Sequence, residues 1–260
     1  MILLIDVGNT RLKWAWLKDS RMSPQQAAVH RGVKRDEWTA ALFDPAREAR
    51  RVLICNVAGA AMAKILAESS RRRFGVKPEF VTTSRRFGEL TNGYAKPALL
   101  GADRWLGLIG AWTRVRSALC VIDAGTAVKA EGVDASGRHL GGLIVPGIQL
   151  MREALLNKTS DIARSARSST PSKRGILANN TVGAVSRGAE FALAGFADHA
   201  ADVLERALGI KPKLLITGGD AETIAANMRR HGEVVPDLVL QGLAAVATGN
   251  SSRLMIQGTS

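Results

Sequence analysis

Two stretches of the sequence share one design, in which a run of aliphatic residues ends in an aspartate and a glycine turn. One is "MILLIDVGNTRLKW" at the start of the chain, and the other is "ALCVIDAGTAVKAEGV" near its middle, with Asp6 and Asp123 at equivalent places. A short apolar run, a Gly-containing turn and a second strand-like run are typical of a buried hairpin. The repeat therefore predicts a tandem pair of related domains, at residues 1–115 and 116–260.

Strand-like and helix-like patterns alternate after each hairpin, which favours an α/β fold with sheets flanked by helices. The sequence predicts strands within 51–59, 78–83, 139–147 and 213–219, and helices near 60–73, 102–115, 147–156, 180–208, 220–230 and 237–248. A polar loop is expected at 159–174.

The composition is that of a folded globular protein, because 46% of the 260 residues are apolar. Cys55 and Cys120 each lie in an apolar, strand-like run, so we expect reduced core residues rather than a disulfide. The N-terminus has no features of a signal peptide, and no apolar run approaches 18 residues. These features predict a cytoplasmic protein that does not bind a membrane.

The formal charge of +13 is the one unusual bulk property. Basic clusters such as "RRRF" at 71–74 lack the interleaved aromatic residues of a nucleic-acid platform, so a solvated basic surface is the favoured interpretation. The four histidines lie far apart in the sequence, with no Cys or acidic partner at ligand spacing. This arrangement does not predict a zinc site.

A strand that ends in Asp and turns through Gly directs several backbone N–H groups into one space, and such a nest binds anions. Phosphate is the natural ligand, and Mg²⁺ is the usual bridge between a phosphate and a carboxylate such as that of Asp6. A single Gly-Asn turn is above all a hairpin signal, but its duplication favours function. The candidate phosphate-binding residues are Gly8, Asn9, Thr10, Gly125 and Thr126.

A third glycine turn lies in "LLITGGDAE", between a buried strand and a helix. Gly218 and Gly219 allow a flat group or a phosphate to approach a helix N-terminus closely. Taken alone, the segment is more simply a strand-to-helix turn with Asp220 as the N-cap. Because it follows two hairpins that are expected to bind phosphate, we expect this turn to lie against the adenosine of a nucleotide.

These three elements in this order resemble the superfamily of acetate and sugar kinases, Hsp70 and actin, and more closely the type III pantothenate kinases. The resemblance rests on "DVGNTRLKW" at 6–14, "NGYAKPALLGADRW" at 92–105, "DAGTA" at 123–127, "GGLIVPG" at 141–147 and "NNTVGAV" at 179–185. It implies two actin-like, ribonuclease H-like domains with mixed sheets and an ATP cleft between them. It also implies phosphorylation of pantothenate by ATP, the first step toward coenzyme A, in a homodimer whose substrate pocket forms against the partner subunit.

The resemblance assigns roles to further residues. A kinase that acts on an alcohol needs a carboxylate to accept the hydroxyl proton, and Asp103 in "LLGADRW" matches that role. Its structural alternative is an early-turn acid favoured by the helix dipole. The residues implied to bind pantothenate are Tyr94, Gly101, Arg104 and Thr181, of which Arg104 suits a carboxylate.

Ordinary structural roles remain open for three of these residues. Tyr94 could be a loop residue that covers the core, and Thr181 could be a helix N-cap. Lys13 could reach phosphate oxygens or be a solvated strand lysine. The resemblance also extends to other kinases of the superfamily and to the Bvg accessory factor group of transcriptional regulators, which the basic charge keeps open.

The strand after "DAGTA" departs from the family pattern, because it continues "VKAEGV" and so carries Lys129 and Glu131. The family resemblance implies a monovalent cation, K⁺ or NH₄⁺, near Asp123. One hypothesis is that the Lys129 ammonium occupies or crowds that site, since it carries the same charge. The alternative is that Lys129 and Glu131 point to solvent as a weak pair.

Overall fold

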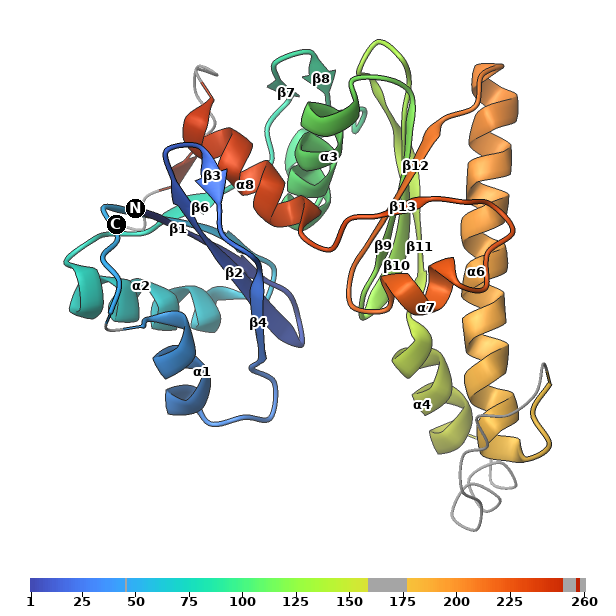
Figure 1. The fold of residues 1–260 in the computed structure, drawn as a ribbon, viewed down its shortest axis with the longest axis horizontal. Helices are drawn as coiled ribbons and strands as arrows, with labels where there is room; N and C mark the ends of the chain where they lie inside the picture. The colour runs from blue at the N-terminus through green and yellow to red at the C-terminus, as the bar shows by residue number, and fades with distance from the viewer. Residues whose placement is uncertain (45, 159–176, 250–255, 258–260) are drawn as a thin grey trace. The chain divides into compact units, whose positions relative to one another are not determined.

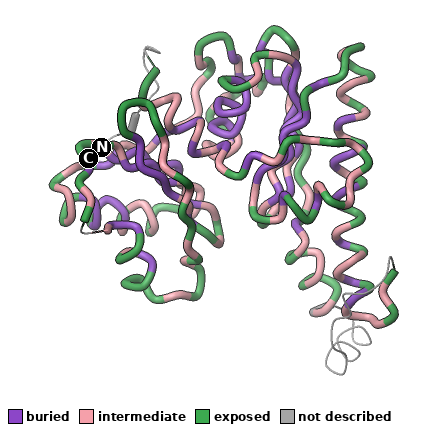
Figure 2. The backbone as a smooth tube through the Cα atoms, viewed as in Figure 1, coloured by how far each residue is buried: buried purple, intermediate pink, exposed green. Residues whose placement is uncertain are grey.

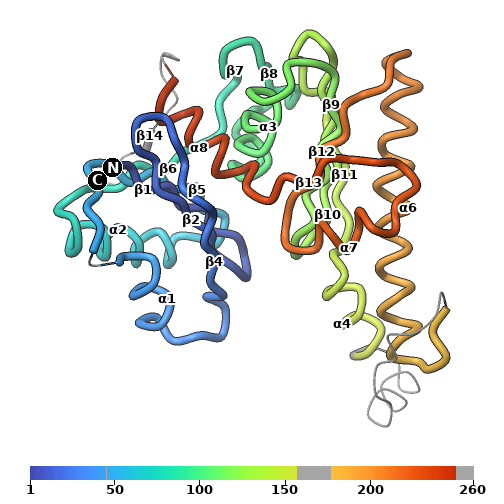
Figure 3. Tube along the Cα trace, in the orientation of Figure 1, coloured from blue at the N-terminus to red at the C-terminus, as the bar shows by residue number. Residues whose placement is uncertain are grey.

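The computed structural model describes residues 1–44, 46–158, 177–249 and 256–257 (Figure 1). The polar loop expected at 159–174 lies outside these residues. The chain forms two compact units, each traced by residue number in Figure 3. The first contains Met1–Ser117, Ala135–Leu140 and Asp237–Ser260, and the second contains Ala118–Asp134 and Gly141–Pro236.

The first unit is built on a mixed sheet with the strand order β14-β6-β5-β1-β2-β3, in which β4 also pairs with β2. Its strands are β1 (Ile2–Val7), β2 (Arg11–Lys18), β3 (Arg21–Met22), β4 (Gln26–Val29), β5 (Arg51–Asn56), β6 (Glu79–Val81) and β14 (Ile256–Gln257). Its helices are α1 (Arg35–Leu42), α2 (Ala60–Phe74), the 3₁₀ turn η1 (Pro97–Leu99), α3 (Ala102–Val115) and α8 (Leu238–Thr248). A two-stranded sheet of β7 (Arg86–Phe87) and β8 (Leu90–Thr91) completes it.

The sheet of the first unit is buried on both faces, which explains why β1 is a continuous apolar run. One face carries Leu3, Ile5 and Val7, which pack in one core with Trp38 of α1 and Leu66 of α2. The helix α8 contacts β1, β2 and β5, and Figure 1 shows it on the opposite side of these strands from α1 and α2. Burial in the first unit is concentrated in the strands and in α3, as Figure 2 shows.

The second unit has a five-stranded sheet with the order β11-β10-β9-β12-β13. Its strands are β9 (Leu119–Ala124), β10 (Ala127–Val133), β11 (His139–Pro146), β12 (Lys213–Thr217) and β13 (Glu233–Val234). Its helices are α4 (Ile148–Lys158), α6 (Thr181–Leu208) and α7 (Ala221–Ala225). Cys120, Ile122 and Ala124 on one face of β9 pack against Leu193 and Ala197 of α6.

Four strands of each sheet repeat one pairing pattern, so the duplication extends beyond the hairpin that the sequence shows. β1 pairs antiparallel with β2 and parallel with β5, and β5 pairs parallel with β6. In the second unit β9 pairs antiparallel with β10 and parallel with β12, and β12 pairs parallel with β13. The predicted α/β class, with mixed sheets flanked by helices, is therefore confirmed.

The compact units differ from the expected division at 115/116 in two segments that return to the first unit. The segment 237–248 does so because α8 crosses α3 with almost no space between the backbones. A Cβ added to Gly110 would lie 2.2 Å from the Leu238 carbonyl oxygen, and one added to Gly242 would lie 2.0 Å from that of Leu106. The segment 135–140 returns because the turn between β10 and β11 packs on β8 and α3.

Contacts of Gly137 hold this second segment in place. The Gly137 carbonyl accepts a hydrogen bond from the Thr91 N–H at 2.8 Å. A Cβ at Gly137, where φ is +85°, would lie 2.9 Å from the Trp112 ring. Such tertiary contacts leave no periodic signal in the sequence, which explains the difference from the expected division.

The local elements follow the predictions closely, with the helix after the third glycine turn as the main difference. The predicted helix at 220–230 is present only as α7, Ala221–Ala225. The helix α1 and the short strands β3, β4, β7 and β8 have too few residues to produce a periodic pattern and were not predicted. The cores of both sheets nevertheless consist of the predicted apolar runs.

Both cysteines are free and buried, as predicted. Burial raises the pKa of the Cys120 thiol to about 12, so this residue is a neutral core thiol at physiological pH. In the part of the chain that the structure describes, no helix combines the length and apolar character that a membrane span requires.

Candidate active site

The first glycine turn joins β1 to β2 at the end of the central strand of the first unit. The Gly8 N–H donates to the Arg11 carbonyl at 3.0 Å, which closes the turn. Asp6 and Lys13 are direct cross-strand partners, and both side chains are half-buried. Opposite residues in an antiparallel pair share one face, so a carboxylate and an ammonium lie together beside the predicted nest.

A histidine from the neighbouring strand region supports this turn. His30 Nε2 lies 2.8 Å from the Gly8 carbonyl oxygen. Because a carbonyl only accepts, Nε2 must carry the proton in this contact. The backbone N–H of His30 also donates to the Thr10 carbonyl at 3.1 Å. Sequence reasoning considered the histidines only as metal ligands and missed this role.

The second turn, between β9 and β10, repeats the same charge arrangement. Asp123 and Lys129 are direct cross-strand partners, and Lys129 Nζ donates to Asp123 Oδ2 at 2.8 Å. The two side chains are 18% and 27% exposed, so the pair is largely shielded from solvent. The duplication therefore includes the lysine, because Lys129 takes the place that Lys13 has opposite Asp6.

The alternative in which Lys129 and Glu131 point to solvent as a weak pair is wrong. Lys129 pairs with Asp123 instead, and Glu131 is only 4% exposed. A Cβ added to Gly142 would lie 2.1 Å from Glu131 Oε2, so the glycine leaves room for the buried carboxylate. The strand pattern alone could not show whether Glu131 is exposed or buried, because its burial depends on contact with β11.

Two further glycines pack directly against the second turn. The Gly147 N–H donates to the Thr126 carbonyl at 3.0 Å, and a Cβ at Gly147 would lie 2.3 Å from the Gly125 oxygen. At Gly218, where φ is +101°, a Cβ would lie 2.3 Å from the Ala124 oxygen. The predicted third turn at Gly218 and Gly219 thus lies beside the second. Gly147, which was quoted only as part of a motif, belongs to the same cluster.

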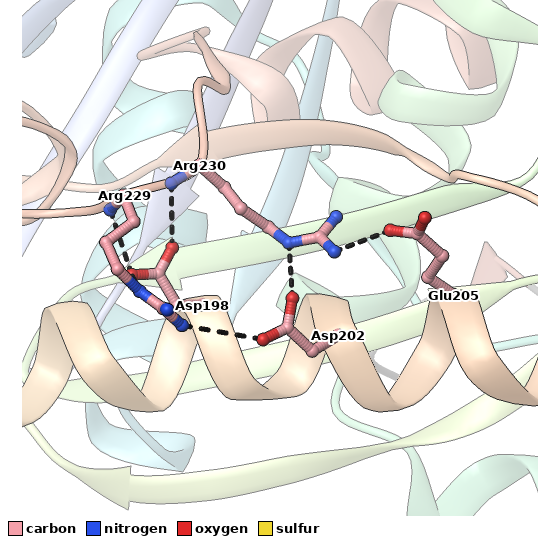
Figure 4. A network of polar contacts seen from close by, with 5 residues as sticks. All are labelled: Asp198, Asp202, Glu205, Arg229 and Arg230. Atoms are coloured by element: carbon pink, nitrogen blue, oxygen red, sulfur yellow. Dashed lines mark hydrogen bonds and ion pairs between the residues drawn. The ribbon is translucent and has the colours of Figure 1, made fainter.

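The segment that follows α7 is anchored to α6 by a charged network (Figure 4). The Asp198 carboxylate, only 3% exposed, accepts the backbone N–H groups of Arg229 and Arg230 at 2.9 and 3.0 Å. The Arg230 guanidinium donates to Glu205 and to Asp202, and these bonds raise the pKa of Arg230. The network fixes the far end of the segment that carries the third glycine turn.

Asp103 lies in the first turn of α3, as the second residue of the helix, and is half-buried. Its carboxylate folds back over Gly101, because a Cβ added to Gly101 would lie 2.6 Å from Asp103 Oδ1. The backbone of Gly101, with φ −55° and ψ 141°, is open to any residue. The glycine is therefore required by the position of the carboxylate and not by the chain conformation.

Arg104 and Tyr94 form one group beside Asp103. Arg104 Nη1 donates to the Tyr94 hydroxyl at 3.0 Å, and the guanidinium carbon lies 5.4 Å from the centre of the ring. A phenol that accepts a bond from a cation still has its own proton to donate. A guanidinium and a phenol placed together suit a carboxylate ligand.

The other predicted residues have simpler positions. Thr181 begins α6 in the second unit, but Asn180 is the N-cap and accepts the Gly183 N–H at 2.8 Å. Asp220 precedes α7 without capping it through its side chain. Asn9, Thr126 and Gly219 are exposed turn residues. Thus the structure groups Tyr94, Gly101, Asp103 and Arg104 in one unit and leaves Thr181 in the other.

The residues that could hold a metal are few. In the ranges 1–44, 46–158 and 177–249, no three His, Cys, Asp or Glu side chains gather as a metal cluster. Asp6 is a single carboxylate beside the first glycine turn. One or two carboxylates plus phosphate oxygens are the usual ligands of Mg²⁺, so the residues fit a magnesium ion that arrives with a nucleotide.

Comparisons with known proteins identify the family to which the chain is similar. The family model described as type III pantothenate kinase matches residues 2–203. A type III pantothenate kinase from Nitrosococcus oceani is 37% identical over 96% of this chain and 95% of its own length. Another, from Nitrosospira multiformis, is 34% identical over 96% of this chain and 92% of its own length.

Among solved structures, two share the fold at low identity. A Campylobacter jejuni protein described as a Baf family transcriptional activator gives a TM-score of 0.58 at 19% identity, covering 95% of this chain and 99% of that one. The activator of 2-hydroxyisocaproyl-CoA dehydratase from Clostridium difficile, with bound ADPNP, gives a TM-score of 0.53 at 14% identity. The match covers 95% of this chain and 93% of that one. These likenesses show the fold alone.

We predict that Gly101→Ala moves the Asp103 carboxylate without unfolding the protein. The new Cβ would meet the end of a flexible side chain, which can rotate at small cost, and the backbone accepts alanine. A crystal structure of the variant should show Asp103 in a different rotamer, with the melting temperature almost unchanged.

Gly107→Ala, on the same helix, is the matched control. A Cβ there meets nothing within 4 Å, so it should leave Asp103 in place and stabilise α3 by about 0.5–1 kcal/mol. An unchanged Asp103 rotamer in Gly101→Ala would contradict the assigned role of Gly101.

Proposed function

The chain belongs to the type III pantothenate kinase family, and we propose that it transfers a phosphoryl group from ATP to pantothenate, giving 4′-phosphopantothenate. This is the first step toward coenzyme A. The observation that carries the proposal is the duplicated hairpin, in which each Asp-Gly turn has a lysine directly opposite its aspartate. Two such turns suit a ligand with several phosphates.

The proposed ATP site uses the glycine turns. Gly8, Asn9 and Thr10 of the first turn and Gly125 and Thr126 of the second bind phosphate oxygens, while Gly218 and Gly219 lie against adenosine. Lys13 neutralises phosphate charge, supported by its place beside the first turn. Mg²⁺ bound near Asp6, directly or through water, would offset the charge that develops on the phosphates during transfer.

Asp103 is the proposed catalytic base. It accepts the proton of the pantothenate hydroxyl as that oxygen attacks the γ-phosphorus, while the bond from the γ-phosphorus to the bridging oxygen breaks and ADP leaves. Tyr94, Gly101, Arg104 and Thr181 bind pantothenate, and the paired Arg104 and Tyr94 hold its carboxylate. A fixed carboxylate at one end of the substrate orients the hydroxyl at the other end toward the base.

The implied monovalent cation does not fit the residues around Asp123. The Lys129 ammonium already lies 2.8 Å from Asp123 Oδ2 and supplies the charge that K⁺ or NH₄⁺ would bring. We infer that Lys129 replaces this cation.

A homodimer is the proposed assembly. β11 is an edge strand of its sheet and carries Leu143 and Ile144, which are 53% and 57% exposed. Phe191 and Val203 of α6 are also exposed. Exposed apolar residues on an edge strand and a neighbouring helix are typical of a surface that another protein covers, and closed pairs are the commonest assembly.

The cytoplasm, where ATP is abundant, is the proposed location, in keeping with the two free cysteines. Regulation of transcription is not favoured as an alternative, because relatives at 34–37% identity over nearly the full chain are pantothenate kinases. Nucleic acid is not a proposed partner.

We predict that Asp103→Asn lowers kcat by about 10²-fold or more while the protein still folds and binds ATP, because the amide cannot accept the proton. A coupled assay with pantothenate, ATP and Mg²⁺ measures the effect. Asp36→Asn is the matched control, since Asp36 is also the second residue of a helix, α1. Both substitutions remove a negative charge that is favourable near a helix N-terminus. Equal and small decreases in kcat for the two variants would therefore mean that Asp103 has only a structural role.

We predict that the wild-type enzyme turns over in buffers free of K⁺ and NH₄⁺, because the ammonium of Lys129 is covalently attached. Lys129→Thr should become dependent on added K⁺, and activity against K⁺ concentration measures this for both proteins. Na⁺ at matched ionic strength is the control. If wild type requires K⁺ as strongly as the variant does, Lys129 does not replace the cation.

We predict a solution mass of twice that of one chain at assay concentration, measured by light scattering. Leu143→Lys should weaken the dimer, since it places a charge on the exposed apolar strand. A single-chain mass for the fully active wild type would remove the proposal.

A further inference from the structure

The loop Asn92–Ala95, which carries Tyr94, is fixed by side chains that sequence reasoning did not select. Arg85 donates to the carbonyls of Asn92, Tyr94 and Ala95 at 3.3, 2.9 and 2.8 Å. The buried Asn92 side chain accepts the Tyr94 N–H at 2.9 Å. Bonds from a charged guanidinium to three carbonyls of one loop define its backbone.

His139, the first residue of β11, supports the same loop from the core. The residue is 0% exposed. Its ring lies nearly parallel to that of Tyr94, with an interplanar angle of 13° and a centre-to-centre distance of 5.9 Å. This is the range of favourable offset stacking between aromatic rings.

The backbone of His139 also limits where the loop can lie. A Cβ added to Gly93 would be 1.9 Å from the His139 carbonyl oxygen, so the loop and β11 touch through their main chains. His139 therefore contacts both the residue before Tyr94 and the ring of Tyr94 itself. In turn the Tyr94 hydroxyl accepts the bond from Arg104.

We propose that His139 is a positioning residue of the pantothenate site, which acts through Tyr94 and rests on the function proposed above for Tyr94 and Arg104. A tyrosine on a loop has two side-chain torsions to fix. Stacking against a fully buried ring restrains both, and keeps the hydroxyl within bonding distance of Arg104. Pantothenate then meets a preformed pair of donors and loses less free energy in ordering them.

The test is a set of steady-state measurements on His139→Ala, Tyr94→Ala and the double variant. His139→Ala should raise the KM for pantothenate by about ten-fold, the size expected when an aromatic pair and the restraint it provides are lost. The KM for ATP should stay within about two-fold. In the Tyr94→Ala background, His139→Ala should have almost no further effect on the KM for pantothenate, because the residue acts through the ring that is gone.

Two more variants separate positioning from folding. His139→Phe keeps an aromatic ring and should restore most of the pantothenate affinity. Arg85→Gln changes an exposed side chain, so it should fold even if changes at buried His139 do not, and it should also raise the KM for pantothenate selectively. Melting temperatures accompany every kinetic measurement.

The outcomes distinguish this inference from the function on which it rests. If Tyr94→Ala leaves the KM for pantothenate unchanged, Tyr94 is not in the pantothenate site and the proposed function of that residue fails. If Tyr94→Ala raises it but His139→Ala and Arg85→Gln do not, the inference about His139 alone is overturned. Equal rises in the KM values for ATP and pantothenate would also overturn it, since they indicate general destabilisation.

Discussion

The antiparallel pairing of the central hairpin in each unit is the constraint on which the rest of the site depends. It places Lys13 opposite Asp6 and Lys129 opposite Asp123, and it directs both glycine turns to the ends of the central strands. Because side chains alternate across a strand, a slip of one residue would separate each charged pair and send one of its members to the opposite face, which packs on α1 and α2 in the first unit and on α6 in the second. Burial of the sheet faces therefore fixes the strand register, and with it the positions of the two charged pairs beside the glycine turns.

Close backbone contact at glycines is the second recurring device. Gly147 and Gly218 let β11 and β12 approach the second turn, while Gly110 and Gly242 let α8 cross α3. In each case a methyl group would overlap a main-chain oxygen that cannot rotate away. Gly101 differs, since the atom it accommodates is the flexible carboxylate of Asp103. The first kind of glycine maintains the fold, and the second maintains the position of the Asp103 carboxylate.

Much of the fold could be predicted because its signals are local. Short apolar runs predict β1, β5, β9 and β12, and a long periodic pattern predicts α6. Each signal lies within the element itself. The pairing of Lys129 with Asp123 was open to two interpretations, since it depends on register. Gly147, His30 and His139 were missed because their contacts join segments that are distant in the sequence. The packing of α8 in the first unit was not predicted either, because its contacts with α3 also join segments that are distant in the sequence.

The proposed pantothenate residues differ in how they are held, and this difference explains the supporting contacts. Asp103 and Arg104 project from α3, whose backbone is fixed by its own hydrogen bonds and by the close crossing with α8. Tyr94 lies on a loop, which has no such ladder. A donor pair made of one helical and one loop residue is only as well ordered as the loop. The contacts from Arg85, Asn92 and His139 supply that order, because each replaces a restraint that regular secondary structure would otherwise provide.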